Sequence, residues 1–195
     1  MKLDITKLTL AADRLLPTLT NRRHIAMISN YRRHAMLEVS GRYDEILIPA
    51  MTVEEPEYWS HTVGGSANFK GMRAIRTLYK FLVDEDICVQ MLTNERLMVN
   101  DWGFSSFSTF QTLYPARYAM SQGALVDDMD AVYIQTCDKA MFWHYDDRNW
   151  LQNEIVWAGA PSYRKCPPAE VLTREECADL LAPLIDQAPA HVVAA

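Results

Sequence analysis

The stretch Met51–Leu82, MTVEEPEYWSHTVGGSANFKGMRAIRTLYKFL, decides the fold of this 195-residue chain. It begins with residues typical of a β-strand and reaches two carboxylates and a proline at Glu54-Glu55-Pro56. A glycine-containing loop follows, and from Ile75 to Leu82 apolar residues recur at helical spacing. The stretch therefore predicts a strand that presents a carboxylate, with an amphipathic helix behind it.

Composition limits the classes of function. Hydrophobic residues make up 49% of the chain, which is enough to form the core of one ordinary domain. The net charge is −6 and the arginines are scattered, so neither nucleic acid nor an anionic membrane is expected as the main partner. The first residues, MKLDITK, interleave charges with apolar residues, which predicts neither a signal peptide nor a membrane span. The four cysteines are isolated, without a CxxC pair, and this pattern favours a reducing cytoplasm and disfavours zinc.

The remaining segments predict an α+β order of elements. Helices are expected from Thr20 or Asn21 to about Ser40 with a stop at Gly41, and at Tyr43–Ile48, Met72–Val83 and Thr173–Ile185. Strands are expected at Met51–Tyr58, Val89–Leu92, Arg96–Asn100, Trp102–Tyr114, Val132–Cys137, Met141–Tyr145 and Trp150–Ala158. An irregular link is expected at Pro115–Asp130 and a disordered Ala/Pro end after the last helix. Helices followed by one strand, another helix and a run of strands indicate an α+β domain.

The strand that carries Glu55, with its helix behind, resembles the segment that holds the catalytic base of ketosteroid isomerase. That enzyme has the cone-shaped α+β barrel of the nuclear transport factor two-like superfamily, which includes SnoaL-like polyketide cyclases and scytalone dehydratase. The resemblance covers roughly residues 21–161. It implies a single SnoaL-like domain over 1–195, with a curved sheet, packed helices, an N-terminal extension (1–20) and a C-terminal helical tail (162–195).

The same resemblance implies catalytic roles for residues on two elements. Glu55 occupies the place of the general base, and a carboxylate in an apolar cavity has a raised pKa that suits proton abstraction near pH 7. Regular alternation along the strand would place Val53 and Glu55 on one inner face. The acid is either Tyr31, which precedes Glu55 by the 24 residues found in ketosteroid isomerase, or His34, if the helices are aligned on their terminal glycine.

The expected hairpin after Asp146 supplies further candidates. Alternation places Met141, Trp143 and Glu154 on the inner face and His144 on the outer one. Met141 stands where ketosteroid isomerase has a protonated aspartate, so the same steroid chemistry is disfavoured and an aromatic ligand is favoured. Glu154 resembles an acidic residue on the last strand of many SnoaL-like proteins, and it could act as a second acid or orient His34.

Several residues are expected near the mouth of the cavity. His61, in the loop after the base strand, is a candidate catalytic residue. For Asp101 the alternative is a structural role in a turn. The candidates for contact with the substrate are Tyr58, Asp101, Trp102, Phe104, Met141 and Trp143.

No cofactor or metal is expected. The sequence lacks the GxGxxG, GxxxxGK[ST], HExxH and GxSxG patterns, and its histidines lack the spacing of metal ligands. A cluster of His24, His34 and Glu38 is the one metal-binding alternative. The sequence thus favours a pocket that works by acid–base chemistry alone.

We therefore expect a cofactor-independent lyase or isomerase that acts on a hydrophobic, phenolic small molecule. Relatives of this length include lyases that release formaldehyde from lignin-derived aromatic dimers; dehydration, cyclisation and isomerisation are the other outcomes. The alternative is a non-catalytic ligand-binding or scaffold subunit of the same fold. A cavity faced by both Glu55 and Tyr31 would favour the enzyme, whereas one filled by Trp143 and Phe104 would favour the scaffold.

The resemblance also implies a homodimer formed through the outer face of the sheet. Phe107, Phe142 and Trp157 are the apolar residues expected on that face.

Overall fold

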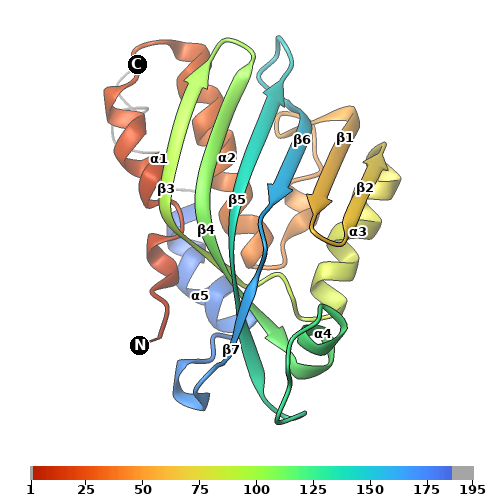
Figure 1. The fold of residues 1–195 in the computed structure, drawn as a ribbon. Coiled ribbons are helices and arrows are strands. Elements are labelled where there is room, and N and C mark those ends of the chain that lie inside the picture. Colours follow the sequence, from red (N-terminus) through yellow and green to blue (C-terminus); the bar gives the residue numbers. More distant parts are fainter. Residues whose placement is uncertain (1, 186–195) are drawn as a thin grey trace.

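The computed structural model, which describes residues 2–185, contains a curved mixed sheet with helices on one face (Figure 1). The α-helices are α1 (Leu10–Leu15), α2 (Arg22–Val39), α3 (Met72–Asp84), α4 (Ala116–Ser121) and α5 (Arg174–Ile185). The strands are β1 (Thr52–Thr62), β2 (Gly65–Lys70), β3 (Gln90–Asn100), β4 (Gly103–Pro115), β5 (Val132–Tyr145), β6 (Leu151–Ala158) and β7 (Ser162–Lys165). This architecture confirms the predicted α+β fold with a curved sheet.

The sheet has the strand order β2-β1-β6-β5-β4-β3, and β7 pairs with the first part of β5. The β1–β6 pair is parallel, while the other pairs are antiparallel. The long strands β4 and β5 pair without a register shift from Gly103 and His144 to Pro115 and Val132. Figure 1 shows that these two strands extend from one end of the sheet to the other.

Helix α2 lies across the inner face of the sheet. The side chain of Asn21 caps its N-terminus by accepting hydrogen bonds from the backbone N–H groups of Arg23 and His24. Its C-terminus is followed by Gly41, whose φ of +71° is a conformation that favours glycine. Both expected ends of this helix are confirmed.

Five expectations about other elements need correction. The glycine-containing loop is a turn and a second strand, β2, which pairs with an extended β1. The two strands predicted between Val89 and Asn100 are the single strand β3, interrupted by a bulge at Asn94 (φ 55°), and the two predicted between Val132 and Tyr145 are the single strand β5. Part of the predicted irregular link is helix α4, and the short helix predicted at Tyr43–Ile48 is a 3₁₀ turn at Tyr43–Glu45.

The N-terminal segment belongs to the core. It forms 3₁₀ turns at Ile5–Lys7 and Leu16–Thr18 on either side of α1, and Leu8, Ala12 and Leu16 are buried. Helix α5 packs against α2 and against the first of these turns. The predicted Ala/Pro end lies outside the described residues. No helix between residues 2 and 185 is both long and apolar enough to cross a bilayer.

The turn between β3 and β4 gives a test of the packing. Gly103 has a φ of +150°, and a Cβ at this position would lie 1.9 Å from the backbone oxygen of Trp143. We expect Gly103→Ala to lower the free energy of unfolding by roughly 2–4 kcal/mol, because backbone on neighbouring β5 must move. Thermal unfolding followed by circular dichroism measures the effect. The control is Gly65→Ala, which has a similar φ of +136° but no atom within 4 Å; equal melting temperatures would contradict the close approach.

Candidate active site

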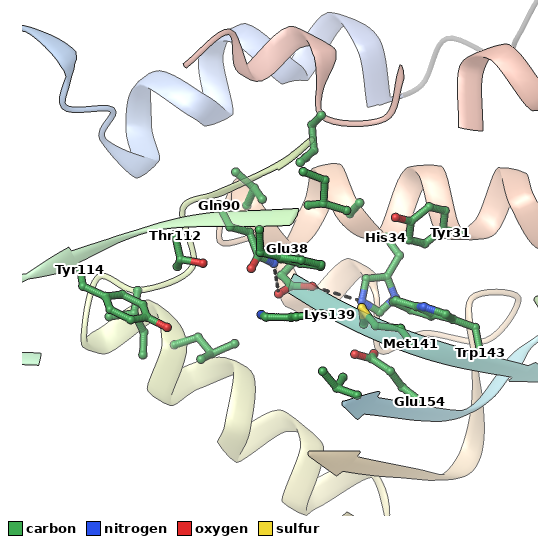
Figure 2. A pocket seen from close by; sticks show the side chains of 18 of the residues that line it. Tyr31, His34, Glu38, Gln90, Thr112, Tyr114, Lys139, Met141, Trp143 and Glu154 are labelled. Carbon is green, nitrogen blue, oxygen red and sulfur yellow. Dashed lines mark hydrogen bonds and ion pairs between the residues drawn. The ribbon is translucent and has the colours of Figure 1, made fainter. Parts of the chain in front are cut away.

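A cavity of about 170 Å³ lies between α2 and the inner faces of β5 and β6. Its wall is mostly apolar, and Figure 2 shows several polar side chains that point into it. The polar and aromatic residues in the wall are Tyr31, His34, Glu38, Gln90, Phe110, Thr112, Tyr114, Tyr118, Lys139, Trp143 and Glu154. A concave space in which polar side chains converge between apolar ones has the character of a small-molecule site.

Helix α2 contributes three residues of one face, Tyr31, His34 and Glu38. The His34 ring is buried, and its Nε2 lies 2.8 Å from the Tyr79 hydroxyl and 3.5 Å from Oε2 of Glu38. The other carboxylate oxygen of Glu38 accepts a hydrogen bond of 3.0 Å from Nε2 of Gln90. Glu38 is therefore held from two sides, while its side chain keeps 18% exposure. These contacts fix a carboxylate at the cavity surface.

Glu154 faces this carboxylate from the opposite wall. It lies on β6, in register with Trp143 on β5 and with Tyr58 on β1. Burial and, secondly, the negative charge of Glu38 raise the pKa of Glu154 to about 8, although the positive charge of Lys139 acts in the other direction. Near pH 7 Glu154 is thus mainly protonated. A carboxyl group that burial keeps protonated, opposite a second carboxyl group, is an arrangement that suits acid–base catalysis.

Lys139 enters the same space from β5. Its Nζ lies 4.0 Å from the centre of the Phe110 ring, at the distance of a cation–π contact. Burial lowers the pKa of Lys139, while nearby Glu38 and Glu154 favour its charged form. The cavity thus contains one cationic and two acidic side chains.

Tyr31 lies one helical turn before His34 and has a hydrogen-bond partner on the sheet. Its hydroxyl donates a hydrogen bond to the carboxyl group of Glu95 on β3, and burial raises the pKa of Glu95 to about 7. Burial and the charge of Glu95 raise the pKa of Tyr31 well above its usual value. Its ring contacts those of Phe104 and Trp143 at centroid distances of 4.8 Å and 5.1 Å. Tyr31 is therefore in the wall of the cavity, and its hydroxyl proton is already donated to Glu95.

A larger hollow adjoins the cavity. Its volume is about 550 Å³, and it shares Tyr114, Tyr118, Lys139 and Val156 with the smaller space. The rest of its wall comes from β5, α4, the β1–β2 hairpin and the chain around the end of β6. A ligand too large for the inner cavity can extend in this direction.

The structure brings five of the predicted site residues to the cavity. These are Tyr31, His34, Met141, Trp143 and Glu154. Two others are buried next to it: Phe104 stacks on Trp143 with the ring centres 5.5 Å apart, and Tyr58 lines a second hollow that also contains Glu154. The outward direction predicted for His144 agrees with its place between two buried neighbours on β5.

The predicted position of Glu55 is wrong. Its side chain is exposed and lies next to Gly71, at the start of α3, rather than in the cavity wall. Val53 is buried as expected, but the β1–β6 pairing shifts register between Thr52 and Glu57. This irregularity interrupts the alternation of the strand, so Glu55 does not share the inner face with Val53.

The predicted mouth residues are also displaced from the site. His61 lies on the outer face, where its ring stacks on Trp157 at 4.0 Å and its Nδ1 lies 2.8 Å from the Ser66 hydroxyl. Asp101 occupies the β3–β4 turn and pairs with His24 at 2.9 Å, which is a structural role. Trp102, in the same turn, is 40% exposed.

His24 pairs with Asp101 at the β3–β4 turn and does not approach His34. The alternative metal cluster of His24, His34 and Glu38 therefore does not form. Residues 2–185 contain no group of three or more His, Cys, Asp or Glu side chains placed to hold a metal ion.

Sequence reasoning missed Glu38 and Lys139 as site residues. Both follow from residues already identified: Glu38 is one helical turn after His34, and Lys139 is two positions before Met141 on the same face of β5. Gln90 and Tyr79, which hold Glu38 and His34, come from distant segments and carry no such signal.

Comparison with solved structures identifies the fold. Hexachlorocyclohexane dehydrochlorinase LinA-type3 from Novosphingobium barchaimii LL02 aligns over 82% of this chain and 97% of its own, with 13% identity and a TM-score of 0.51. A LinA structure aligns over 82% of this chain and 96% of its own, with 12% identity and a TM-score of 0.50. The chain has the fold of the nuclear transport factor two-like superfamily. No protein-family model and no curated protein matches the sequence.

The raised pKa of Glu154 predicts a pH-dependent stability. Its pKa is about 8 in the folded chain, whereas the ordinary pKa of a glutamate is 4.5, so between these pH values the folded state holds a proton that the unfolded state releases. Stability is therefore lost as the pH rises from about 4.5 to about 8. The free energy of unfolding of Glu154→Gln, taken relative to wild type, should therefore be greater at pH 9 than at pH 5, by a few kcal/mol.

Urea unfolding at the two pH values measures this difference. Glu55→Gln, which changes an exposed carboxylate, is the control and should show the same difference from wild type at both. If the difference in stability between Glu154→Gln and wild type were also the same at both pH values, the burial of this carboxyl group would be contradicted.

Proposed function

We propose that the protein is a cofactor-independent lyase or isomerase that acts on a hydrophobic aromatic small molecule. The observation that carries the proposal is the pair of glutamates on opposite walls of one cavity. Glu38 is the base, because it is held at the cavity surface as a carboxylate. Glu154 is the acid, because burial keeps it protonated near pH 7.

The proposed reaction moves two protons. Glu38 takes a proton from a C–H bond of the substrate, and the electron pair of that bond forms a new carbon–carbon double bond. Glu154 gives its proton either to a second carbon, which completes an isomerisation, or to a leaving oxygen, which departs as a hydroxyl compound. Glu38 then carries the proton and Glu154 the charge, so transfer of one proton from Glu38 to Glu154 restores the starting state.

His34 and Tyr31 have supporting roles in this proposal. His34 has a polar contact with the carboxylate of Glu38 and is itself held by Tyr79, so it positions the base. Tyr31 donates to Glu95 and provides an aromatic surface against which the substrate lies. The acid predicted among these two residues is thus reassigned to Glu154.

The volume of the cavity supports a compact reacting group. A cavity of about 150 Å³ in another protein accommodates benzene, so the 170 Å³ here is suited to about one aromatic ring. Release of formaldehyde from a lignin-derived dimer is one specific form of this proposal. Glu38 would then take the O–H proton of a hydroxymethyl group, the carbon–carbon bond to that group would break to give formaldehyde, and its electron pair would form the new double bond while Glu154 protonates the leaving oxygen. The second ring of the dimer would lie in the adjoining hollow of about 550 Å³. The shared fold with a dehydrochlorinase supports elimination as a reaction type that this architecture accommodates.

A non-catalytic ligand-binding or scaffold role is the second candidate. The stacked rings of Phe104 and Trp143 favour it, because they fill space next to α2 that a substrate would otherwise use. The cavity that remains beside them favours the enzyme.

Turnover by variants separates these roles. Wild-type protein is incubated with a panel of single-ring phenols and ketones, phenolic dimers and steroid enones, and products are detected by mass spectrometry. On the compound that reacts, we expect Glu38→Gln and Glu154→Gln each to lower kcat by roughly 10²- to 10⁴-fold. Tyr31→Phe should have a smaller effect. Glu55→Gln is the matched control and should keep wild-type activity, because its side chain is outside the cavity.

Exchange of substrate hydrogen in deuterium oxide, followed by NMR, tests the base separately from the acid. Glu38→Gln should stop this exchange, whereas Glu154→Gln should retain part of it. Full turnover by Glu38→Gln would show that the base is another group, and tight binding of a panel member without any turnover would favour the ligand-binding role.

We also propose a homodimer formed through the outer face of the sheet. Phe107, Phe142 and Trp157 are all exposed there, and strand register places them on adjacent strands β4, β5 and β6. Trp59 and His61 on β1 extend the same surface. The helices lie on the opposite face, so this aromatic surface is uncovered (Figure 1).

We expect Trp157→Glu to convert the dimer into a monomer, because it places a charge at the centre of this surface. Light scattering after size exclusion at micromolar concentration measures the mass. The control is Leu125→Glu, a charge introduced at an exposed apolar residue in the segment after α4, away from this surface. Monomeric wild-type protein would refute the proposal.

The four cysteines support a proposed location in the cytoplasm. Cys88, Cys137, Cys166 and Cys177 are buried free thiols. Proteins with structural thiols of this kind are typical of reducing compartments.

A further inference from the structure

Lys139 has no polar partner in the part of the chain that the structure describes. Lys80 and Lys165, by comparison, form ion pairs with aspartates at 2.6 Å and 2.9 Å. The Lys139 side chain is half-buried in the cavity wall, and among residues 2–185 no carboxylate oxygen lies within 4.0 Å of its Nζ and no hydrogen-bond acceptor within 3.5 Å. Its close neighbour is the face of the Phe110 ring. A ligand in the cavity that supplies an acceptor would form a charge-assisted hydrogen bond with this ammonium group.

The position of Lys139 places this free donor group beside the proposed base and acid. Figure 2 shows Lys139 between Glu38 and Glu154, and all three side chains line the cavity. With Glu38 charged, Glu154 protonated and Lys139 charged, the three groups are neutral in sum. Transfer of a substrate proton to Glu38 removes its negative charge, so Lys139 is then left with the charge that has developed on the substrate.

We propose that the substrate is a carbonyl compound with an acidic C–H bond, and that Lys139 is a catalytic residue which binds the oxygen of its enolate. This inference rests on the proposed acid–base function and specifies its substrate class as ketones, aldehydes or esters. Glu38 takes the proton from the carbon next to the carbonyl group, the electron pair of the C–H bond becomes the carbon–carbon double bond of the enolate, and the carbonyl oxygen takes the negative charge. Its ion pair with Lys139 stabilises this state more than the neutral substrate, which lowers the barrier.

Lys139 acts as an ammonium group in this inference, although burial lowers its pKa. The Phe110 ring and the acidic neighbours all attract a positive charge. A neutral amine could instead condense with the carbonyl group to form an imine and water. The two mechanisms are distinguishable, because only an imine is trapped by borohydride as a covalent adduct.

A binding experiment tests the inference without any turnover. The probe is 4-nitrophenol, whose anion resembles an enolate in charge and shape and is visible by its absorbance; 4-nitroaniline is the neutral compound of similar shape. We expect wild-type protein to bind the nitrophenolate more tightly than the aniline and to lower the apparent pKa of the bound phenol. Lys139→Met should weaken nitrophenolate binding by roughly 10- to 100-fold, the range for a hydrogen bond to a charged group, and should leave aniline binding unchanged.

Three controls keep this test independent of folding and of the proposed reaction. Lys80→Met removes a surface charge and should leave both affinities at the wild-type value. Retained binding of 4-nitroaniline reports an intact cavity, and Lys139→Gln is the second variant if Lys139→Met does not fold. Glu38→Gln should retain the nitrophenolate preference although it has lost turnover, so failure of the acid–base proposal and failure of this one are distinguishable.

Equal affinity of wild-type protein for the two probes, or an unchanged preference in Lys139→Met, would overturn the inference. A borohydride-trapped adduct at Lys139 with the reacting carbonyl compound would also overturn it, in favour of an imine.

Discussion

Contact between three aromatic rings fixes helix α2 against the sheet, and the position of the site depends on it. Tyr31 of α2 packs on Phe104 of β4 and Trp143 of β5, with ring centres 4.8 Å and 5.1 Å apart. Such contacts contribute beyond the area that they bury because the rings meet at defined angles. They set the rotation of the helix, so the residues one and two turns later, His34 and Glu38, face the same sheet where the cavity lies.

The site combines groups that individually destabilise a folded domain. Burial displaces the pKa values of Glu154, Glu95 and Lys139 in the direction that disfavours their charged forms. Keeping any of them charged in the folded domain therefore costs free energy. A structural core would be more stable with apolar residues in these places. Glu154 and Lys139 line the cavity and Glu95 holds Tyr31 in its wall, and this grouping indicates a functional constraint on the sequence rather than a structural one.

The sequence predicted the elements that depend on local signals. Asn21 and Gly41 mark the ends of α2, and the spacing of apolar residues after Met72 marks α3. Alternation along β5 and β6 placed Met141, Trp143 and Glu154 correctly. Such signals succeed where the chain is regular.

Non-local features were beyond the same reasoning. The register shift in β1 is produced by its parallel pairing with β6, a strand about a hundred residues away, so the exposure of Glu55 is not visible in its own segment. The free ammonium group of Lys139 is likewise a property of its neighbours, Phe110 and the two glutamates, rather than of β5 alone.

The N-terminal segment is part of the site although the resemblance to the superfamily begins after it. Leu8 lies in the wall of the cavity, and together with Lys7 and Ala11 it borders the groove that contains Glu95. The carboxyl group that holds the Tyr31 hydroxyl is thereby sheltered by residues that precede it by more than eighty positions. A chain shortened to residues 21–161 would lose these contacts together with β7 and α5, so the part of the chain that resembles the superfamily is shorter than the part that builds the core and the site.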